Sequence, residues 1–178
     1  MDPAAQWTIW TIGHSTRPIA AFLAALAAHR IELVADVRRF PGSRRQPQYG
    51  AQPLAASLAE CGVAYHSIPA LGGRRRAAPD SPNVGWRHPA FRGYADHLVT
   101  EEFADGLFEL MLLSGGLRTA IMCAETLWWR CHRRLIADVL TSIDMPVIHI
   151  RDATHSEPHR LAPPARIDGG LLTYGEDR

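Results

Sequence analysis

Short apolar runs alternate along the chain with longer amphipathic stretches. The runs at residues 7–12, 32–37, 63–68, 118–123 and 146–150 have the length of buried strands, and residues 171–174 form a shorter candidate for a sixth. The spacing of apolar residues predicts helices over residues 18–29, 52–61 and 126–142, and two helices within 89–113 that meet near Thr100. We expect Thr16 to cap the first helix, with Pro18 in its first turn, and Thr126 to cap the last.

This alternation predicts an α/β fold, with a mostly parallel β-sheet flanked by helices in a Rossmann-like or related three-layer arrangement. The length of 178 residues suits a single compact domain, with residues 1–6 and 175–178 expected to be flexible ends. Two loops, at residues 38–51 and 69–88, are longer than ordinary connections in such a domain and are rich in Gly, Pro and Arg. Long loops of this kind usually carry function, so we expect these two to border a site.

Polar residues gather directly after the predicted strands. Because ligands of open α/β sheets bind outside the carboxyl ends of the strands, these residues are candidates for one shared site. In chain order they are His14 and Ser15; Asp36, Arg38, Ser43, Arg44 and Arg45; Gly72 and Gly73; Cys123 and Glu125; and Arg151 and Asp152.

The distribution of charge along the chain indicates which class of ligand this site binds. All 19 basic residues are arginines, which excludes Schiff-base and P-loop chemistry that depends on lysine. Residues 36–79 hold seven arginines against two acidic residues, an excess of five positive charges, although the whole chain has a net charge of +1. Guanidinium groups grip carboxylates and phosphates with two hydrogen bonds, so we expect an anionic partner: a small molecule, a nucleotide or a nucleic acid.

The cysteine count and the hydropathy indicate where the protein works. Three cysteines without a visible export signal fit a reduced, cytoplasmic protein better than a disulfide framework. The chain has no run of about 18 apolar residues, so we expect no membrane-spanning helix and no membrane partner.

Cys123 and Glu125, followed by Cys131, His132 and Arg133, form the segment richest in reactive groups. A strand end close to a helix N-terminus lowers the pKa of a thiol, so Cys123 and Cys131 are candidate nucleophiles; the alternative is that both are small core residues. No pair of cysteines has the CxxC spacing of a zinc site. The histidines of the tail, His155 and His159, are spaced irregularly, so the sequence requires no cofactor and predicts no metal.

Six motifs together resemble domain-of-unknown-function family 488. They are TIGHS at residues 11–15, DVRRFPGSRR at 36–45, LGG at 71–73, MCAE at 122–125, CHR at 131–133 and PHRL at 158–161. The resemblance covers residues 8–174 and implies a compact α/β domain of bacteria and archaea without a settled activity, sometimes associated with DNA repair. The arginines that follow Gly73, at residues 74–76, are not part of the family pattern.

Three hypotheses of function follow. The first is a hydrolase or transferase that acts on a phosphate-bearing nucleotide or nucleic acid, with an N-glycosidic bond as one candidate target. Its catalytic candidates are Glu125, Asp36, His14 and His132, and its anion-binding candidates are Arg38, Ser43, Arg44, Arg45, Gly72, Gly73, Arg133 and Ser15. The second is a non-catalytic nucleic-acid-binding module associated with DNA repair, although a pI of about 7.9 argues against a broad basic face. The third is a thiol- or metal-dependent enzyme that uses Cys123, Cys131 and His132.

Overall fold

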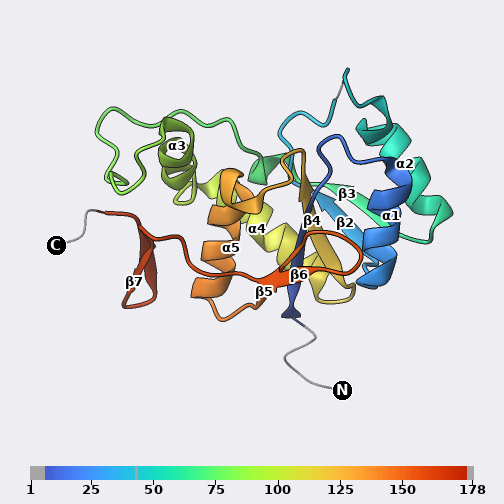
Figure 1. Cartoon of the computed structure of the whole chain (residues 1–178). Coiled ribbons are helices and arrows are strands. Elements are labelled where there is room, and N and C mark those ends of the chain that lie inside the picture. Colours follow the sequence, from blue (N-terminus) through green and yellow to red (C-terminus); the bar gives the residue numbers. More distant parts are fainter. Residues whose placement is uncertain (1–6, 43, 176–178) are drawn as a thin grey trace.

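A computed structural model of the chain describes residues 7–42 and 44–175 (Figure 1). The helices are α1 (Ile19–Ala28), α2 (Ala51–Glu60), α3 (Pro89–His97), α4 (Glu101–Ser114) and α5 (Arg133–Ser142). The strands are β1 (Ile9–Gly13), β2 (Leu33–Asp36), β3 (Ala64–Ser67), β4 (Thr119–Cys123), β5 (Val147–Ile150), β6 (Ser156–Pro158), β7 (Arg166–Asp168) and β8 (Leu171–Thr173). The ends expected to be flexible lie outside the described residues, except for Gly175.

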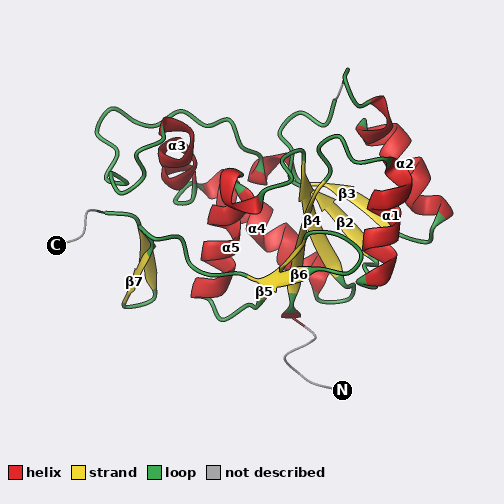
Figure 2. Ribbon diagram, in the orientation of Figure 1, coloured by secondary structure: helices red, strands yellow, loops and turns green. Residues whose placement is uncertain are grey.

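The main sheet has the order β3-β2-β4-β1-β5-β6 (Figure 2). Strands β1 to β5 are mutually parallel, and only the short edge strand β6 runs antiparallel to its neighbour. The predicted α/β fold and its five principal strands are therefore confirmed. Residues 171–173 are a strand as expected, but they pair with β7 in a separate hairpin. Its two-residue loop is Gly169-Gly170, and positive φ at both positions is what a tight type I′ turn requires.

The sheet is covered on both faces, which gives the predicted three layers. Apolar side chains that alternate along the central strands point to opposite faces: Ile12 and Met122 pack with α1 and α2, whereas Ile121 packs with α3, α4 and α5. Figure 1 shows α1 and α2 on one side of the sheet and α4 and α5 on the other. None of the helices in the described part of the chain is long and apolar enough to cross a membrane.

The predicted starts of two helices are wrong. Helix α1 begins at Ile19 with Pro18 as its N-cap and without a side-chain cap, because residues 14–17 form a turn closed by the Arg17 amide donating to the His14 carbonyl. The helix expected from residue 126 is a 3-10 turn at Trp128–Arg130 followed by α5 from Arg133, so Thr126 caps nothing there. The Trp128 indole holds this segment away from a helical path, because it stacks on His149 at 4.0 Å. The junction expected near Thr100 is confirmed, and the Thr100 side chain caps α4 by accepting from the Phe103 amide.

Candidate functional site

A cavity of about 710 Å³ lies at the carboxyl ends of β1, β2 and β4, where the sequence places the strand-end polar groups. The loop after β3 and the start of α3 close its other side. Its wall combines a thiol and imidazole cluster, four arginines, one carboxylate and four aromatic rings; the rings belong to Phe40, Phe91, Tyr94 and Trp129. A cavity of this size falls in the range of small-molecule sites.

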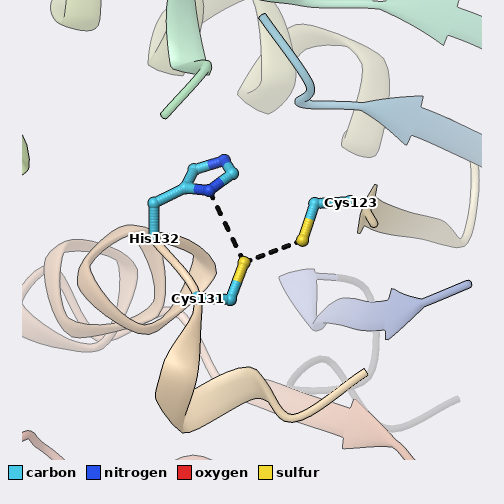
Figure 3. Close-up of side chains that lie close together, drawn as sticks. All are labelled: Cys123, Cys131 and His132. Carbon is cyan, nitrogen blue, oxygen red and sulfur yellow. Dashed lines mark hydrogen bonds between the residues drawn. The ribbon is translucent and has the colours of Figure 1, made fainter. Parts of the chain in front are cut away.

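Two cysteines meet at the floor of the cavity (Figure 3). Cys123 ends β4, Cys131 lies two residues before the start of α5, and their sulfur atoms lie 2.7 Å apart as free thiols. Both side chains are almost fully buried but belong to the cavity wall. Since a disulfide bond measures about 2.05 Å, the sulfurs need to move by less than about 1 Å to bond.

His132 stands beside this pair with a defined tautomer. Its Nε2 lies 3.0 Å from the carbonyl oxygen of Val37, which can only accept, so Nε2 carries the proton. Burial lowers the pKa of His132, which keeps the ring neutral and leaves Nδ1 as an acceptor. Nδ1 lies 3.5 Å from the Sγ of Cys131, so the imidazole can accept the proton of that thiol.

Arg133 lies under the two cysteines and is the most deeply buried arginine of the described chain, with 1% of its surface exposed. Its Nε donates to the Sγ of Cys123 at 3.2 Å, and Nη1 donates to the Thr11 hydroxyl at 3.1 Å. Nη2 donates to the carbonyl oxygen of Glu125, and the backbone amide of Arg133 donates to the Sγ of Cys131. The guanidinium therefore places a fixed positive charge next to both sulfur atoms.

The surroundings separate the pKa values of the two thiols. Burial alone would raise the pKa of Cys131, but the hydrogen bond from Cys123 and the charge and hydrogen bonds of Arg133 outweigh it and lower the pKa to about 6. Burial, and the hydrogen bond with Cys131, raise the pKa of Cys123 well above its ordinary value. At neutral pH, Cys131 is therefore the thiolate and Cys123 the thiol that donates to it.

The same three side chains are of the types that bind zinc, and their donor atoms lie within 4.8 Å of one another. Two Zn–S bonds of about 2.3 Å at a tetrahedral angle separate the sulfurs by about 3.7 Å. The sulfurs of Cys123 and Cys131 are about 1 Å closer than that, and a cationic guanidinium lies against one of them. The guanidinium beside Cys123 disfavours a second cation at this position, so the arrangement favours a pair of thiols over a metal centre.

Arg38 lies in the opposite wall of the cavity and is rigidly held. Asp36, at the end of β2, accepts from Nε and Nη2 of Arg38 at 2.8 Å and 2.6 Å and also from the Tyr65 hydroxyl. The Nη1 of Arg38 donates to the Nε2 of His14, whose Nδ1 donates to the Ser15 carbonyl. At least three of the five guanidinium N–H groups are thus used within the described chain, and Arg38 also lines the cavity.

His14 is a buried, neutral partner of Arg38. Burial lowers the pKa of His14, and its ring stacks on Tyr49 at 4.1 Å. Because its Nε2 lone pair faces Arg38, the ring supports the guanidinium and does not offer a base to the cavity. Asp36 does not line the cavity at all, since its oxygens are taken by Arg38 and Tyr65.

Positive charge dominates the cavity wall. Arg38, Arg39, Arg74 and Arg130 line it, whereas its one carboxylate is that of Glu125, an exposed side chain that accepts from the Leu127 amide. Charges of one sign in a concave wall focus the field on a ligand of the opposite sign. The cavity is therefore suited to an anion.

Two glycines allow the close packing of the site. A Cβ on Gly13 would lie 1.9 Å from the carbonyl oxygen of Glu125, so the loop after β4 can lie against β1 only because the side chain is missing. A Cβ on Gly73 would lie 2.9 Å from the Nδ1 of His132. Gly73 therefore sets the space in which the imidazole faces Cys131.

The structure brings together only some of the residues selected from the sequence. Those that line the cavity are His14, Arg38, Gly73, Cys123, Glu125, Cys131 and His132. Those that do not line it are Ser15, Asp36, Arg44, Arg45, Gly72 and Arg133. Gly72 packs on the backbone of Arg39, and Arg44 and Arg45 point to solvent. Ser43 lies outside the described residues.

Sequence reasoning missed several residues that shape the site. Tyr94 packs its ring 5.1 Å from that of His132 and donates its hydroxyl to the Leu71 carbonyl. Arg74 and Arg130 line the cavity, although the sequence analysis gave neither a role. Arg74 follows Gly73 directly and Arg130 precedes Cys131, so adjacency to the selected motifs was the signal available for both.

A family model described as Domain of unknown function DUF488 matches residues 18–140 of the chain. This span contains β2 to β4 and both cysteines of the cavity. Comparison with curated proteins and with solved structures found no match.

Proposed function

The chain belongs to the DUF488 family, and we propose that this member is a thiol-dependent enzyme that acts on an anionic substrate, with Cys131 as its nucleophile. One observation carries the proposal: a buried guanidinium and a second thiol stabilise the Cys131 thiolate at the floor of an arginine-lined cavity. A thiolate is the nucleophilic form of cysteine, and a stabilised thiolate inside a cavity is a functional rather than a packing feature.

The contacts favour Cys131 over Cys123 as the attacking atom. Cys123 donates to Cys131 and accepts from the Nε of Arg133 and from the Glu125 amide, so its sulfur is enclosed by partners on the protein side. Cys131 accepts a hydrogen bond from Cys123 and also faces the unprotonated Nδ1 of His132, which can accept the proton of Cys131 whenever that thiol is protonated. This is the arrangement of covalent catalysis: Cys131 is the nucleophile, His132 is the base, and the Val37 carbonyl orients that base.

The charge of the wall indicates the substrate class. Arg38 lines the cavity from a fixed position, and Arg74 and Arg130 add exposed positive charge to its wall. A carboxylate or phosphate group is the natural ligand for this set. The aromatic rings of Phe91 and Trp129 provide apolar area for the rest of the molecule, so a phosphate-bearing nucleotide remains in the proposed class.

The proposed step balances without a cofactor. The Cys131 thiolate forms a bond to an electrophilic atom of the substrate, and the bond from that atom to the leaving group breaks with its electron pair on the leaving group. An anionic leaving group such as a phosphate needs no proton for this departure and is stabilised by Arg38. Cys123 keeps its proton during the attack and lies within reach of the new bond.

The carboxylate-centred hydrolase is less well supported. It needs two available carboxyl groups, but Asp36 is committed to Arg38 and Tyr65 away from the cavity, which leaves Glu125 alone. A nucleic-acid-binding module needs basic side chains on an open face, whereas four arginines here line a concavity. Both readings predict that Cys131 can be replaced without loss of function.

Paired alkylation with iodoacetate and iodoacetamide tests the proposal, because the two reagents differ in charge and act at the same sulfur. Tryptic cleavage after arginine separates Cys123, in residues 119–130, from Cys131, in residues 131–133. Exposed Cys61 serves as the control within the same molecule. We expect the ratio of the iodoacetate rate to the iodoacetamide rate to be several-fold higher at Cys131 than at Cys61.

Variants that remove one positive charge from the cavity wall can be compared with a variant that removes one elsewhere on the surface. Arg74→Gln and Arg130→Gln should lower the iodoacetate rate at Cys131 and leave its iodoacetamide rate nearly unchanged, whereas Arg87→Gln, an exposed arginine outside the cavity, should change neither. Equal ratios at Cys131 and Cys61, or no reaction at Cys131 with either reagent, would contradict the proposal.

A further inference from the structure

A continuous chain of buried polar groups leads away from the cysteine pair through the sheet to α5. It begins at Arg133, whose Nη1 donates to the Thr11 hydroxyl at 3.1 Å. Thr11 lies 2.7 Å from the Nδ1 of His149, and the Nε2 of His149 lies 2.9 Å from the Nδ1 of His159. The Nε2 of His159 lies 2.8 Å from Oδ1 of Asp138.

The two ends of this chain fix the direction of every hydrogen bond in it. Arg133 can only donate, so the Thr11 hydroxyl accepts there and is free to donate its own proton to the Nδ1 of His149. The proton of His149 is then on Nε2 and is donated to the Nδ1 of His159. His159 consequently donates from Nε2 to the carboxylate of Asp138. One set of tautomers therefore satisfies each link, with all donors pointing from the cation toward the carboxylate.

The far end is anchored independently. Asp138 also accepts from the amide of Ala162 at 2.9 Å and from the Tyr174 hydroxyl at 2.9 Å, and its side chain is fully buried. The indole of Trp128 covers His149 in a parallel stack at 4.0 Å. Burial, with the charge of Arg133, holds the pKa of His149 well below its ordinary value, which keeps that ring neutral.

We propose that Asp138, His159, His149 and Thr11 form a positioning relay that orients Arg133 and thereby sets the ionisation of Cys131. The relay rests on the proposed function, because its output is the thiolate that acts as nucleophile. None of its four members lines the large cavity, so each is a positioning residue and not a catalytic one.

The relay explains how the Arg133 guanidinium can be buried without a large cost in free energy. A guanidinium that is almost fully buried needs partners for its N–H groups, and Thr11 supplies one on the side away from Cys123 and the Glu125 carbonyl. A threonine whose own proton is already committed to His149 presents only a lone pair to Arg133. The guanidinium plane is therefore held in the orientation that directs Nε at Cys123.

Thr11→Val cuts the relay and keeps the shape of the side chain, whereas Thr11→Ser keeps the hydroxyl. Both variants are made in the full chain with Cys61→Ser, and the iodoacetamide rate at Cys131 is measured against pH. The groups that face Cys131 are Cys123, His132, Arg133 and Tyr94, and none of them is changed. We expect Thr11→Val to raise the pKa of Cys131 by about one unit, which lowers its alkylation rate at pH 6 by about fivefold. Thr11→Ser should behave like the parent protein.

A second measurement keeps the relay testable if Thr11→Val fails to fold. In the parent protein, nitrogen NMR of the imidazoles should show Nδ1 of His149 and of His159 without a proton and Nε2 of both protonated. The opposite tautomer at His149 would overturn the relay. So would a folded Thr11→Val protein with an unchanged Cys131 pKa. An ordinary thiol pKa at Cys131 in the parent protein would instead overturn the proposed function, so the two failures are distinguishable.

Discussion

The Nδ1 of His132 lies 3.5 Å from the Sγ of Cys131, and it faces the sulfur without a proton because the Nε2 of the same ring is committed to the Val37 carbonyl. This relationship joins Val37, the residue after β2, which supplies the carbonyl, to the segment before α5, which supplies the thiol. It makes the reactivity of Cys131 depend on contacts that lie far apart in the sequence, and each of these contacts can be tested by substitution.

Gly73→Ala should disturb the imidazole directly. The added Cβ would lie 2.9 Å from Nδ1 of His132, so the ring has to move away from Cys131. We expect a loss of about 1–3 kcal/mol in the free energy of unfolding in urea and a slower alkylation of Cys131. Gly42→Ala is the control, because a Cβ there meets nothing within 4 Å on the same cavity wall. Equal behaviour of the two variants would show that Gly73 does not set the position of His132.

Arg133→Gln should raise the pKa of Cys131, because the glutamine cannot supply the positive charge beside both sulfurs. Hydrogen bonds to charged groups are worth about 1.5–3 kcal/mol, which corresponds to a rise of about one to two pKa units. The shift is read from the pH dependence of Cys131 alkylation. Arg134→Gln is the neighbouring control, since Arg134 packs over the ring of Trp86 and contacts neither sulfur. A similar shift in both variants would point to a general change in the fold.

Asp36→Ala should be strongly destabilising, because it leaves the buried guanidinium of Arg38 without its ion-pair partner. Removing one member of a buried pair typically costs about 3–5 kcal/mol. Tyr65→Phe removes only one hydrogen bond to the same carboxylate and should cost about 1 kcal/mol. Urea unfolding of both variants measures the difference. A cost for Asp36→Ala no larger than that for Tyr65→Phe would contradict the ion-pair account.

Oxidation of the Cys61→Ser protein with diamide should link Cys123 to Cys131. Diamide takes up the two electrons and two protons that disulfide formation releases, and the sulfurs already lie 2.7 Å apart. The product should appear as a cross-link between the tryptic peptides of residues 119–130 and 131–133, without dimers. Two thiols that stay free, or cross-links only between molecules, would be incompatible with the described pair.

Much of the fold was predictable because the central strands are buried on both faces and therefore appear as continuous apolar runs. The convergence of His14, Arg38 and Cys123 at one cavity also follows from local information, since each ends a parallel strand or follows one within two residues. The prediction of a helix from residue 126 was wrong because the conformation there depends on residues distant in the sequence. The conformation of Trp128 depends on His149 and on Glu157, which accepts from its indole N–H, and both lie more than 20 residues later.

The roles of individual side chains were less predictable than their places. Asp36 and Arg38 were both selected as site residues, but only packing shows that the carboxylate is used up in holding the guanidinium. Arg133 resembled a surface ligand-binding residue within the CHR motif, and it is instead buried against the sulfurs. Its link to Asp138 passes through Thr11 in β1 and His149 in β5, which no local pattern connects.

The central claim is that Cys131 is a stabilised thiolate, and its alkylation rate as a function of pH tests this most directly. Because the thiolate is the reactive form, the rate rises as the pH passes upward through the pKa. In the Cys61→Ser protein, with the peptide of residues 131–133 quantified by mass spectrometry, we predict a half-maximal rate at a pH of about 6. A half-maximal rate near the ordinary thiol pKa of about 8.5, or above it, would contradict the account.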